Sequence, residues 1–330
     1  MKIAVVGLGA VGGLMAAKLA GVGHAVSALA RGATLASVRE HGVRLTIAGA
    51  QTASAITASD DARALGPQDL VIVALKGQSL AAAAQTMQPL LGPNTLVMPA
   101  MNGVPWWFLQ AAPVSACLGD RSLPSVDPDG RIAALLPLER VLGCVVHLTC
   151  SSPAPGVIRH GFGDRLIVGE PGGGASPRAD TVCAALALAG FKSESSADIR
   201  HDIWFKLWGN MTMNPVSALT GTTTDHILDD PLVHAFILRT MEEAAQIGAR
   251  IHCPITQSGE ERMALTRQLG GFKTSMLQDA EAGRAIELDA LVAAVHEIGT
   301  RLSVPMPNIG TLLGLTRLMA RERGLYPPAA

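Results

Sequence analysis

Three polar side chains recur at a fixed spacing inside an apolar stretch of this sequence, IWFKLWGNMTMNPVSALTG. Lys206, Asn210 and Asn214 stand four residues apart, so on an α-helix they lie along one face. Buried ammonium and amide groups are costly without polar partners, and the flanking tryptophans argue against the alternative of a solvated face. The spacing therefore predicts a site for a small polar molecule, beside a helix that Pro215 breaks.

A second segment, KTSMLQDAEAGRAIELDALV, carries a hydroxyl group and a carboxylate. Ser275 falls in a loop or at a helix start, and Glu287 falls in the first turns of a long expected helix. The helix dipole favours an acid there, which explains Glu287 without any function. The alternative is a carboxylate that faces Lys206 across a cleft.

Near the start of the chain, Gly7-Leu8-Gly9-Ala10-Val11-Gly12 follows the strand-like run KIAVV and opens a helix expected over 10–21. In such a GxGxxG pattern, the first glycine permits a tight turn and the second lets a pyrophosphate approach the backbone. The third lets the helix pack on the strand. Free N–H groups at the helix start attract phosphate, so the pattern predicts a dinucleotide site. The alternative is a run of helix-packing glycines.

The type of dinucleotide depends on the residue that ends the second strand. Folds selective for NAD place an acid there, but no acidic residue of this chain precedes Glu40. Arg31 stands at that point and can bind the 2′-phosphate of NADP, or else be a solvated surface charge. We therefore expect NADP(H) as the cofactor.

Two more polar residues stand where strand-like runs end. Lys76 closes DLVIVALK, and Asn102 closes NTLVMPAMN. Ligands of open parallel sheets bind at the carboxyl ends of the strands, so both residues are expected to face the cofactor. The plain alternatives are a solvated charge for Lys76 and an Asn-Gly turn for Asn102.

The elements that must position these residues change in kind along the chain. Strands alternate with helices over residues 1–197, which predicts an α/β, Rossmann-type doubly wound parallel sheet for cofactor binding. Later strands of this domain are expected to extend the sheet, partly antiparallel, over 140–150, 156–161 and 165–171. Residues 198–330 predict an all-α substrate domain with a frayed tail, YPPAA, and helices over 198–214, 231–250, 257–269, 284–303 and 308–322.

Composition excludes several classes of protein. Hydrophobic residues make up 48% and the net charge is −1, so disorder and a nucleic-acid surface are not expected. The apolar runs carry charges or glycines, which argues against membrane spans. The cysteines form no CxxC pair, so we expect reduced thiols, a cytoplasmic location and no metal site; they are Cys117, Cys144, Cys150, Cys183 and Cys253. The apolar helical domain could supply a homodimer interface.

Taken together, these motifs resemble those of the ketopantoate reductase (2-dehydropantoate 2-reductase) family over nearly the whole chain. The resemblance rests on GLGAVGG, ARG, LK, NG, GEP at 169–171, KLWGNMTMNPVSALTG and TSMLQD…IELD. It implies that Lys206 donates a proton and that Asn210, Asn214 and Ser275 hold the substrate. It further implies that Asn102 lies near both nicotinamide and substrate, and that Glu287 touches the substrate or the nicotinamide ribose. It also implies that the residues from Gly7 to Gly12, with Arg31 and Lys76, bind NADP.

The implied chemistry suits the residues. Hydride delivered to a ketone carbon turns its oxygen into an alkoxide, which a nearby ammonium stabilises and protonates. The first hypothesis is reduction of ketopantoate to pantoate by NADPH, in pantothenate and coenzyme A biosynthesis. The second is the same reaction on another small 2-oxo acid. The third, a non-catalytic NADP-binding sensor, would not need both Lys206 and Glu287. Substrate choice is expected to depend on the segment 104–142, where Trp106-Trp107 begins close to the predicted cleft.

Overall fold

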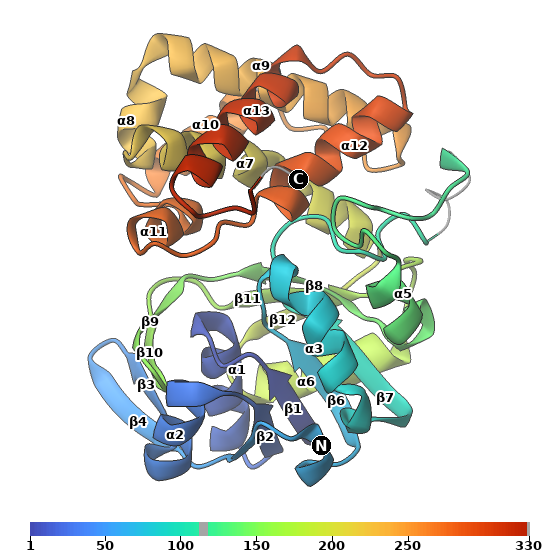
Figure 1. The fold of residues 1–330 in the computed structure, drawn as a ribbon, viewed down its shortest axis with the longest axis vertical. Helices are drawn as coiled ribbons and strands as arrows, with labels where there is room; N and C mark the ends of the chain where they lie inside the picture. Colours follow the sequence, from blue (N-terminus) through green and yellow to red (C-terminus); the bar gives the residue numbers. More distant parts are fainter. Residues whose placement is uncertain (112–117, 329–330) are drawn as a thin grey trace. The chain divides into compact units, whose positions relative to one another are not determined.

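The computed structural model describes residues 1–111 and 118–328, and the chain forms two compact units (Figure 1). Unit 1 comprises Met1–Met101 and Asp129–Asp202, and unit 2 comprises Asn102–Pro128 and Ile203–Ala330. The second boundary lies close to the one expected at 197/198. The first differs from expectation, because Asn102–Pro128 interrupts unit 1 and belongs to the helical unit.

The interruption has a physical cause in its aromatic side chains. Trp107 and Phe108 are fully buried, and the Phe108 ring stacks on Trp204 of the helical unit with centroids 6.0 Å apart. Burying such rings contributes a large apolar area to one core. Nothing in the alternation of strands and helices could have indicated which core receives them.

The main sheet of unit 1 is the parallel sheet that the sequence predicts. Its strand order is β5-β2-β1-β6-β7, with all neighbours parallel. The strands are β1 (Lys2–Val6), β2 (Ala25–Leu29), β5 (Thr57–Ser59), β6 (Gln68–Val73) and β7 (Leu91–Pro99). The connecting helices are α1 (Ala10–Gly21), α2 (Gly32–His41) and α3 (Leu80–Thr86). The strand order reverses at β1, and this is where open sheets bind ligands. β1 and β6 are almost wholly buried, as expected for strands covered on both faces.

The later strands of unit 1 form two further sheets instead of simply extending this one, although a parallel bridge between Val97 of β7 and Val141, just before β8, joins the main sheet to one of them. A three-stranded sheet has the order β12-β11-β8, and a four-stranded sheet has the order β4-β3-β10-β9. The expected antiparallel pairing occurs between β8 and β11. Their bounds are β3 (Val43–Ile47), β4 (Ala50–Ser54), β8 (Gly143–His147), β9 (Cys150–Ala154), β10 (Val157–His160), β11 (Arg165–Gly169) and β12 (Lys192–Ser196). Strand β3 pairs antiparallel with β4 on one side and parallel with β10 on the other.

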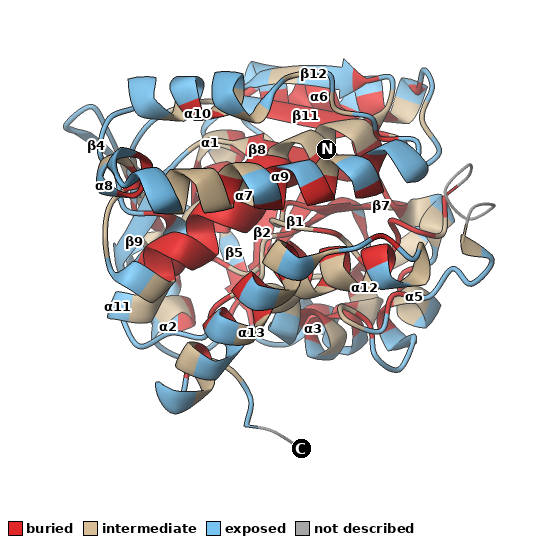
Figure 2. Cartoon of the chain, turned by 90° about the horizontal axis from the view of Figure 1, so that it is seen from above, coloured by how far each residue is buried: buried red, intermediate tan, exposed pale blue. Residues whose placement is uncertain are grey.

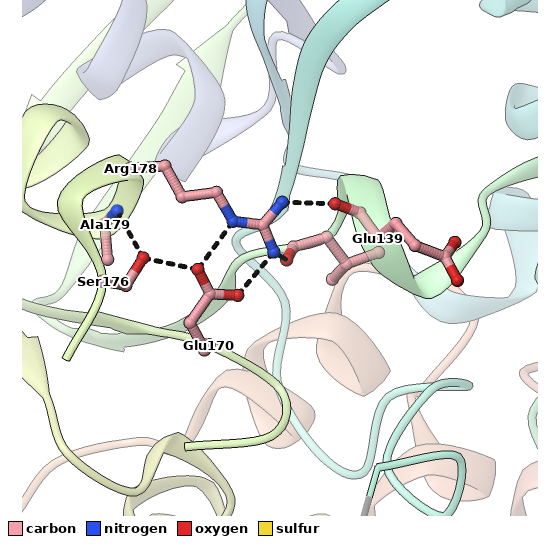
Figure 3. Close-up of polar contacts among 6 residues, drawn as sticks. Glu139, Glu170, Ser176, Arg178 and Ala179 are labelled. Carbon is pink, nitrogen blue, oxygen red and sulfur yellow. Dashed lines mark hydrogen bonds and ion pairs between the residues drawn. The ribbon is translucent and has the colours of Figure 1, made fainter. Parts of the chain in front are cut away.

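The GEP motif joins β11 to the helix α6 (Pro177–Leu188), as Figure 3 shows. Arg178 donates from Nε to Glu170 at 2.6 Å and binds the second carboxylate oxygen through Nη2. Ser176 donates to the same carboxylate and accepts from the backbone N–H of Ala179, which caps the helix. The hydrogen bonds from the Arg178 side chain lower the pKa of Glu170. This part of the resemblance is therefore explained by a structural role. The short helix α5 (Arg131–Leu135) completes unit 1.

Unit 2 is helical, and its longest helix runs further than expected. α7 (Ile199–Thr220) continues through Pro215 instead of ending at 214. Proline removes the N–H that would bond the Met211 carbonyl, but residues 211–218 are all buried, and this packing offsets the loss (Figure 2). The other helices are α8 (Thr224–Asp229), α9 (Pro231–Arg250), α10 (Gly259–Gln268), α11 (Ser275–Glu281), α12 (Ala294–Arg301) and α13 (Pro307–Glu322).

The helix expected over 284–303 begins later and differently. Glu287 lies just before the helix and outside regular secondary structure, the helix begins at Leu288, and a π-helical turn covers Asp289–Ala293 before α12. Such turns insert one residue and frequently occur at functional sites.

None of the helices in the described ranges is both long and apolar enough to span a membrane. Within 1–111 and 118–328, no cluster of His, Cys, Asp or Glu is arranged to hold a metal ion. Cys144, Cys150, Cys183 and Cys253 form no disulfide bond within the described ranges, and Cys117 lies outside them.

Candidate active site

A cavity of about 370 Å³ lies in unit 1 at the carboxyl ends of β1 and β2. Gly7, Leu8 and Gly9 line it from the first turn, and Arg31 lines it from the start of α2. The remaining lining residues are Val6, Leu29, Ala30, Thr34, Asp60, Leu75, Ala82, Ala83, Thr86 and Ser152. This is where the GxGxxG pattern places a dinucleotide.

The three glycines of the pattern have three different environments. Gly7 has φ +95°, and a Cβ there would lie 2.7 Å from the Ala74 carbonyl oxygen. A Cβ on Gly9 would meet no described atom within 4 Å, so this residue opens directly onto the cavity. A Cβ on Gly12 would lie 2.0 Å from the Gly7 carbonyl oxygen. Ala10, Val11 and Gly12 form the first turn of α1, whose unbonded N–H groups can bind an anion.

The cavity also contains residues that the sequence analysis missed. Asp60 follows β5, the edge strand beside β2, and Thr34 lies in the first turn of α2 with Arg31 before it. Strand β5 has only three residues, which is too few for a periodic pattern to predict it. The acidic residue Asp60 directly after it was the one sequence feature that could have indicated a place in the site. Lys76 follows β6 as expected, although it is not among the described residues that line this cavity.

In unit 2, the structure brings together two residues that lie 104 positions apart. Lys206 on α7 donates from Nζ to Oδ1 of Asn102 at 2.8 Å. Both side chains are partly exposed. The Asn102 carboxamide oxygen accepts this hydrogen bond, so the NH₂ group of the same side chain can donate to other acceptors. The pair combines a proton donor with a fixed orientation, as a general acid requires.

Asn102 is held by the turn that follows it. Gly103 has φ +84°, and a Cβ there would lie 2.5 Å from the Ala290 carbonyl oxygen. That oxygen belongs to the π-helical turn and accepts the N–H of Val104 at 2.8 Å. The Asn-Gly turn is therefore real, and it fastens Asn102 to the helix that begins directly after Glu287.

The remaining predicted residues occupy different settings in unit 2. Asn210 is partly exposed and Asn214 is buried, both on α7 at the spacing that places them along the Lys206 face. Ser275 is exposed as the first residue of α11, while its neighbour Thr274 caps that helix by accepting from Leu277. Asn210 and Asn214 thus share helix α7 with Lys206, whereas Ser275 lies on α11, a separate helix of unit 2.

The tryptophans expected beside a cleft are core residues. Trp106 is 2% exposed and Trp107 is wholly buried, in the cluster of Phe108 and Trp204. The prediction that this pair begins a substrate-facing segment is therefore not supported by its burial. A run of two tryptophans resembles a binding surface in sequence, but it fills an interior here.

Comparisons with known proteins cover both units. Residues 3–173 match the family described as Ketopantoate reductase PanE/ApbA, and residues 198–320 match its C-terminal part. A 2-dehydropantoate 2-reductase of Mesorhizobium japonicum is 42% identical over 99% of this chain and 100% of its own. A crystal structure from Ralstonia solanacearum MolK2, described as a candidate ketopantoate reductase, is 58% identical, with a TM-score of 0.94 over 98% of this chain and 99% of that one. The 2-dehydropantoate 2-reductase of Methylococcus capsulatus is 25% identical, with a TM-score of 0.83 over 98% of each chain.

Proposed function

The chain belongs to the ketopantoate reductase family, and from that premise we propose that it reduces 2-dehydropantoate to pantoate with NADPH. The reaction serves pantothenate and coenzyme A biosynthesis. The single observation that carries the proposal is the hydrogen bond between Lys206 and Asn102, because it fixes the position of an ammonium group. Lys206 lies within residues 198–320, which match the C-terminal part of the family.

NADPH supplies the hydride when it is bound. The cavity of unit 1 suits this molecule, since Gly9 leaves the backbone open to a pyrophosphate and Arg31 can bind a 2′-phosphate. In this proposal Gly7 to Gly12, Arg31 and Lys76 bind the cofactor. Asn102 and Glu287 contact its nicotinamide end.

Lys206 is the proton donor. As the ketone oxygen gains charge, the ammonium stabilises it and transfers one proton, so that the hydroxyl group forms and neutral lysine remains. The proton returns to lysine from solvent. Asn210, Asn214 and Ser275 hold the carboxylate and hydroxyl groups of the substrate, and Glu287 fixes its orientation.

The test is turnover of NADPH with purified protein, followed by the nicotinamide absorbance. Rapid oxidation with ketopantoate is expected, and the Lys206→Ala variant should lose a factor of about 10²–10⁴ in kcat, the usual contribution of a general acid. Lys192→Ala is the matched control, since this exposed lysine pairs only weakly with Asp164 at 3.4 Å. Turnover with other 2-oxo acids alone would establish the second hypothesis, and binding of NADPH without turnover would establish the sensor.

Cofactor choice has its own test. Arg31→Ala should lower the preference for NADPH over NADH, because the 2′-phosphate loses its guanidinium partner. An unchanged preference would remove Arg31 from the site.

A cytoplasmic homodimer completes the proposal. An apolar groove of about 250 Å³ in unit 2 lies between α7, α9 and α13, and beside it Leu232 is 80% exposed. Such patches often mark interfaces, and a second copy is the occupant that we propose. Light scattering should give the mass of two chains, and Leu232→Glu should give the mass of one.

A further inference from the structure

The C-terminal tail is fastened to the segment that carries Glu287. After α13 the chain turns at Gly324, which has φ +66°, and the N–H of Leu325 donates to the Ala320 carbonyl at 2.7 Å. Leu325 is then buried at 2% exposure. The tail expected to fray is therefore ordered through Tyr326.

Two contacts join the tail to residues on either side of Glu287. The N–H of Ile286 donates to the Leu325 carbonyl at 3.0 Å. The hydroxyl group of Tyr326 donates to the carboxylate of Asp289. One contact lies one residue before Glu287 and the other lies two residues after it, so the tail bridges the position that presents the carboxylate.

The tyrosine contact lies in a partly desolvated setting. Burial raises the pKa of Asp289, and burial together with Asp289 raises the pKa of Tyr326. Tyr326 therefore stays a neutral donor over the working range of an enzyme. A hydrogen bond in such a setting of low dielectric is stronger than one in water.

The segment is fastened before and after these contacts as well. Arg284 donates from Nε to Asp279 at 2.8 Å, and its own N–H bonds the Asp279 carbonyl at 2.8 Å. Beyond Asp289, the Ala290 carbonyl accepts the N–H of Val104, two residues after Asn102. Glu287 thus lies outside regular secondary structure between fixed points, and the tail supplies the nearest of them, at Ile286 and Asp289.

We propose that Tyr326 and Asp289 are positioning residues, which hold Glu287 where the proposed reaction needs its carboxylate. The proposal rests on the proposed function. Neither side chain needs to touch the substrate. Their effect is to limit the positions that the backbone at Glu287 can adopt, and a displacement of about 1 Å can cost a factor of about 10² in rate.

The experiment compares Tyr326→Phe in two backgrounds. In the native background we expect kcat/KM for ketopantoate to fall about tenfold, with a smaller change in the KM for NADPH, because only the nicotinamide end is proposed to contact Glu287 and the cofactor cavity lies in unit 1. In the Glu287→Ala background the same change should have no further effect, since residues that act through one another are not additive. Asp289→Asn should keep most activity because its amide oxygen still accepts, whereas Asp289→Ala should match Tyr326→Phe.

Thr311→Val is the control, since it removes one hydroxyl hydrogen bond of α13, to Pro307 at 2.7 Å, away from Glu287. Thermal unfolding of every variant reports folding separately. An equal loss from Tyr326→Phe in both backgrounds would mean a purely structural role and overturn the proposal, as would native kcat/KM in Tyr326→Phe and Asp289→Ala. If Glu287→Ala is as active as the native enzyme, the positioning proposal falls while the reductase function stands.

Discussion

Gly103→Ala perturbs the turn that holds Asn102, with an effect that the structure lets us estimate. An alanine at φ +84° costs about 1–2 kcal/mol in backbone strain. Its Cβ would also lie 2.5 Å from the Ala290 carbonyl oxygen, and this atom cannot yield easily because it belongs to the π-helical turn. Relief requires the Val104 hydrogen bond to lengthen or break, which adds about 1 kcal/mol.

The total is about 2–3 kcal/mol, which corresponds to a fall of about 5–10 °C in the thermal midpoint. The larger effect should be on catalysis. The clash displaces Asn102 and with it the acceptor of Lys206, so kcat should fall by a factor of about 10², whereas NADPH binding should change less because the cofactor cavity lies in unit 1.

Gly221→Ala is the matched control, because this glycine of unit 2 also has a positive φ, +68°, but its Cβ would meet no described atom within 4 Å. It should lose about 1 kcal/mol of stability and keep native kcat. The assays are thermal unfolding and NADPH oxidation with ketopantoate. Equal kcat in the two variants would refute the reasoning, because the turn would then not position Asn102.

Three further predictions concern other parts of the chain. Gly9→Ala should fold normally but weaken NADPH binding, measured by titration, whereas Gly12→Ala should fail to fold because its Cβ would lie 2.0 Å from a backbone oxygen. Glu170→Gln should lower stability at pH 7 by about 1–2 kcal/mol in chemical unfolding. Because hydrogen bonds from its arginine partner lower the pKa of Glu170, this difference should begin to shrink as the pH falls below about 4, where the carboxyl group of the unfolded chain protonates, and should vanish only below the lowered pKa of the folded state. The single tyrosine of the chain, Tyr326, should show no phenolate absorbance at about pH 10, where free tyrosine is half ionised, because burial raises its pKa. Half ionisation at that pH would contradict the burial.

The sequence could predict what depends on local pattern. The strand, turn and helix around Gly7 to Gly12 followed from glycine spacing, and α7 followed from its polar stripe. The pairing of Lys206 with Asn102 could not be derived from spacing, because 104 residues separate them and nothing local specifies the contact.

Other failures also have physical causes. Pro215 suggested a helix end, but packing on buried neighbours outweighs one lost hydrogen bond. Glu287 was expected inside a helix, because no simple pattern distinguishes a π-helical turn from an ordinary one. The tail at Tyr326 looked free because proline and alanine follow it, whereas its order depends on a partner 37 residues earlier.

The insertion of Asn102–Pro128 into unit 1 also affects how the chain is made. During synthesis from the N-terminus, Trp107 and Phe108 leave the ribosome roughly a hundred residues before Trp204, the ring against which Phe108 stacks. At about 5–20 residues per second, this leaves a strongly apolar segment without its core for about 5–20 s. The last strand of unit 1, β12, is synthesised before Trp204. Unit 1 can therefore fold while the inserted segment Asn102–Pro128 still lacks its core. If the chain were expressed as two separate pieces cut after residue 202, the second piece would lack Asn102–Pro128, and the first would carry that apolar segment without its core.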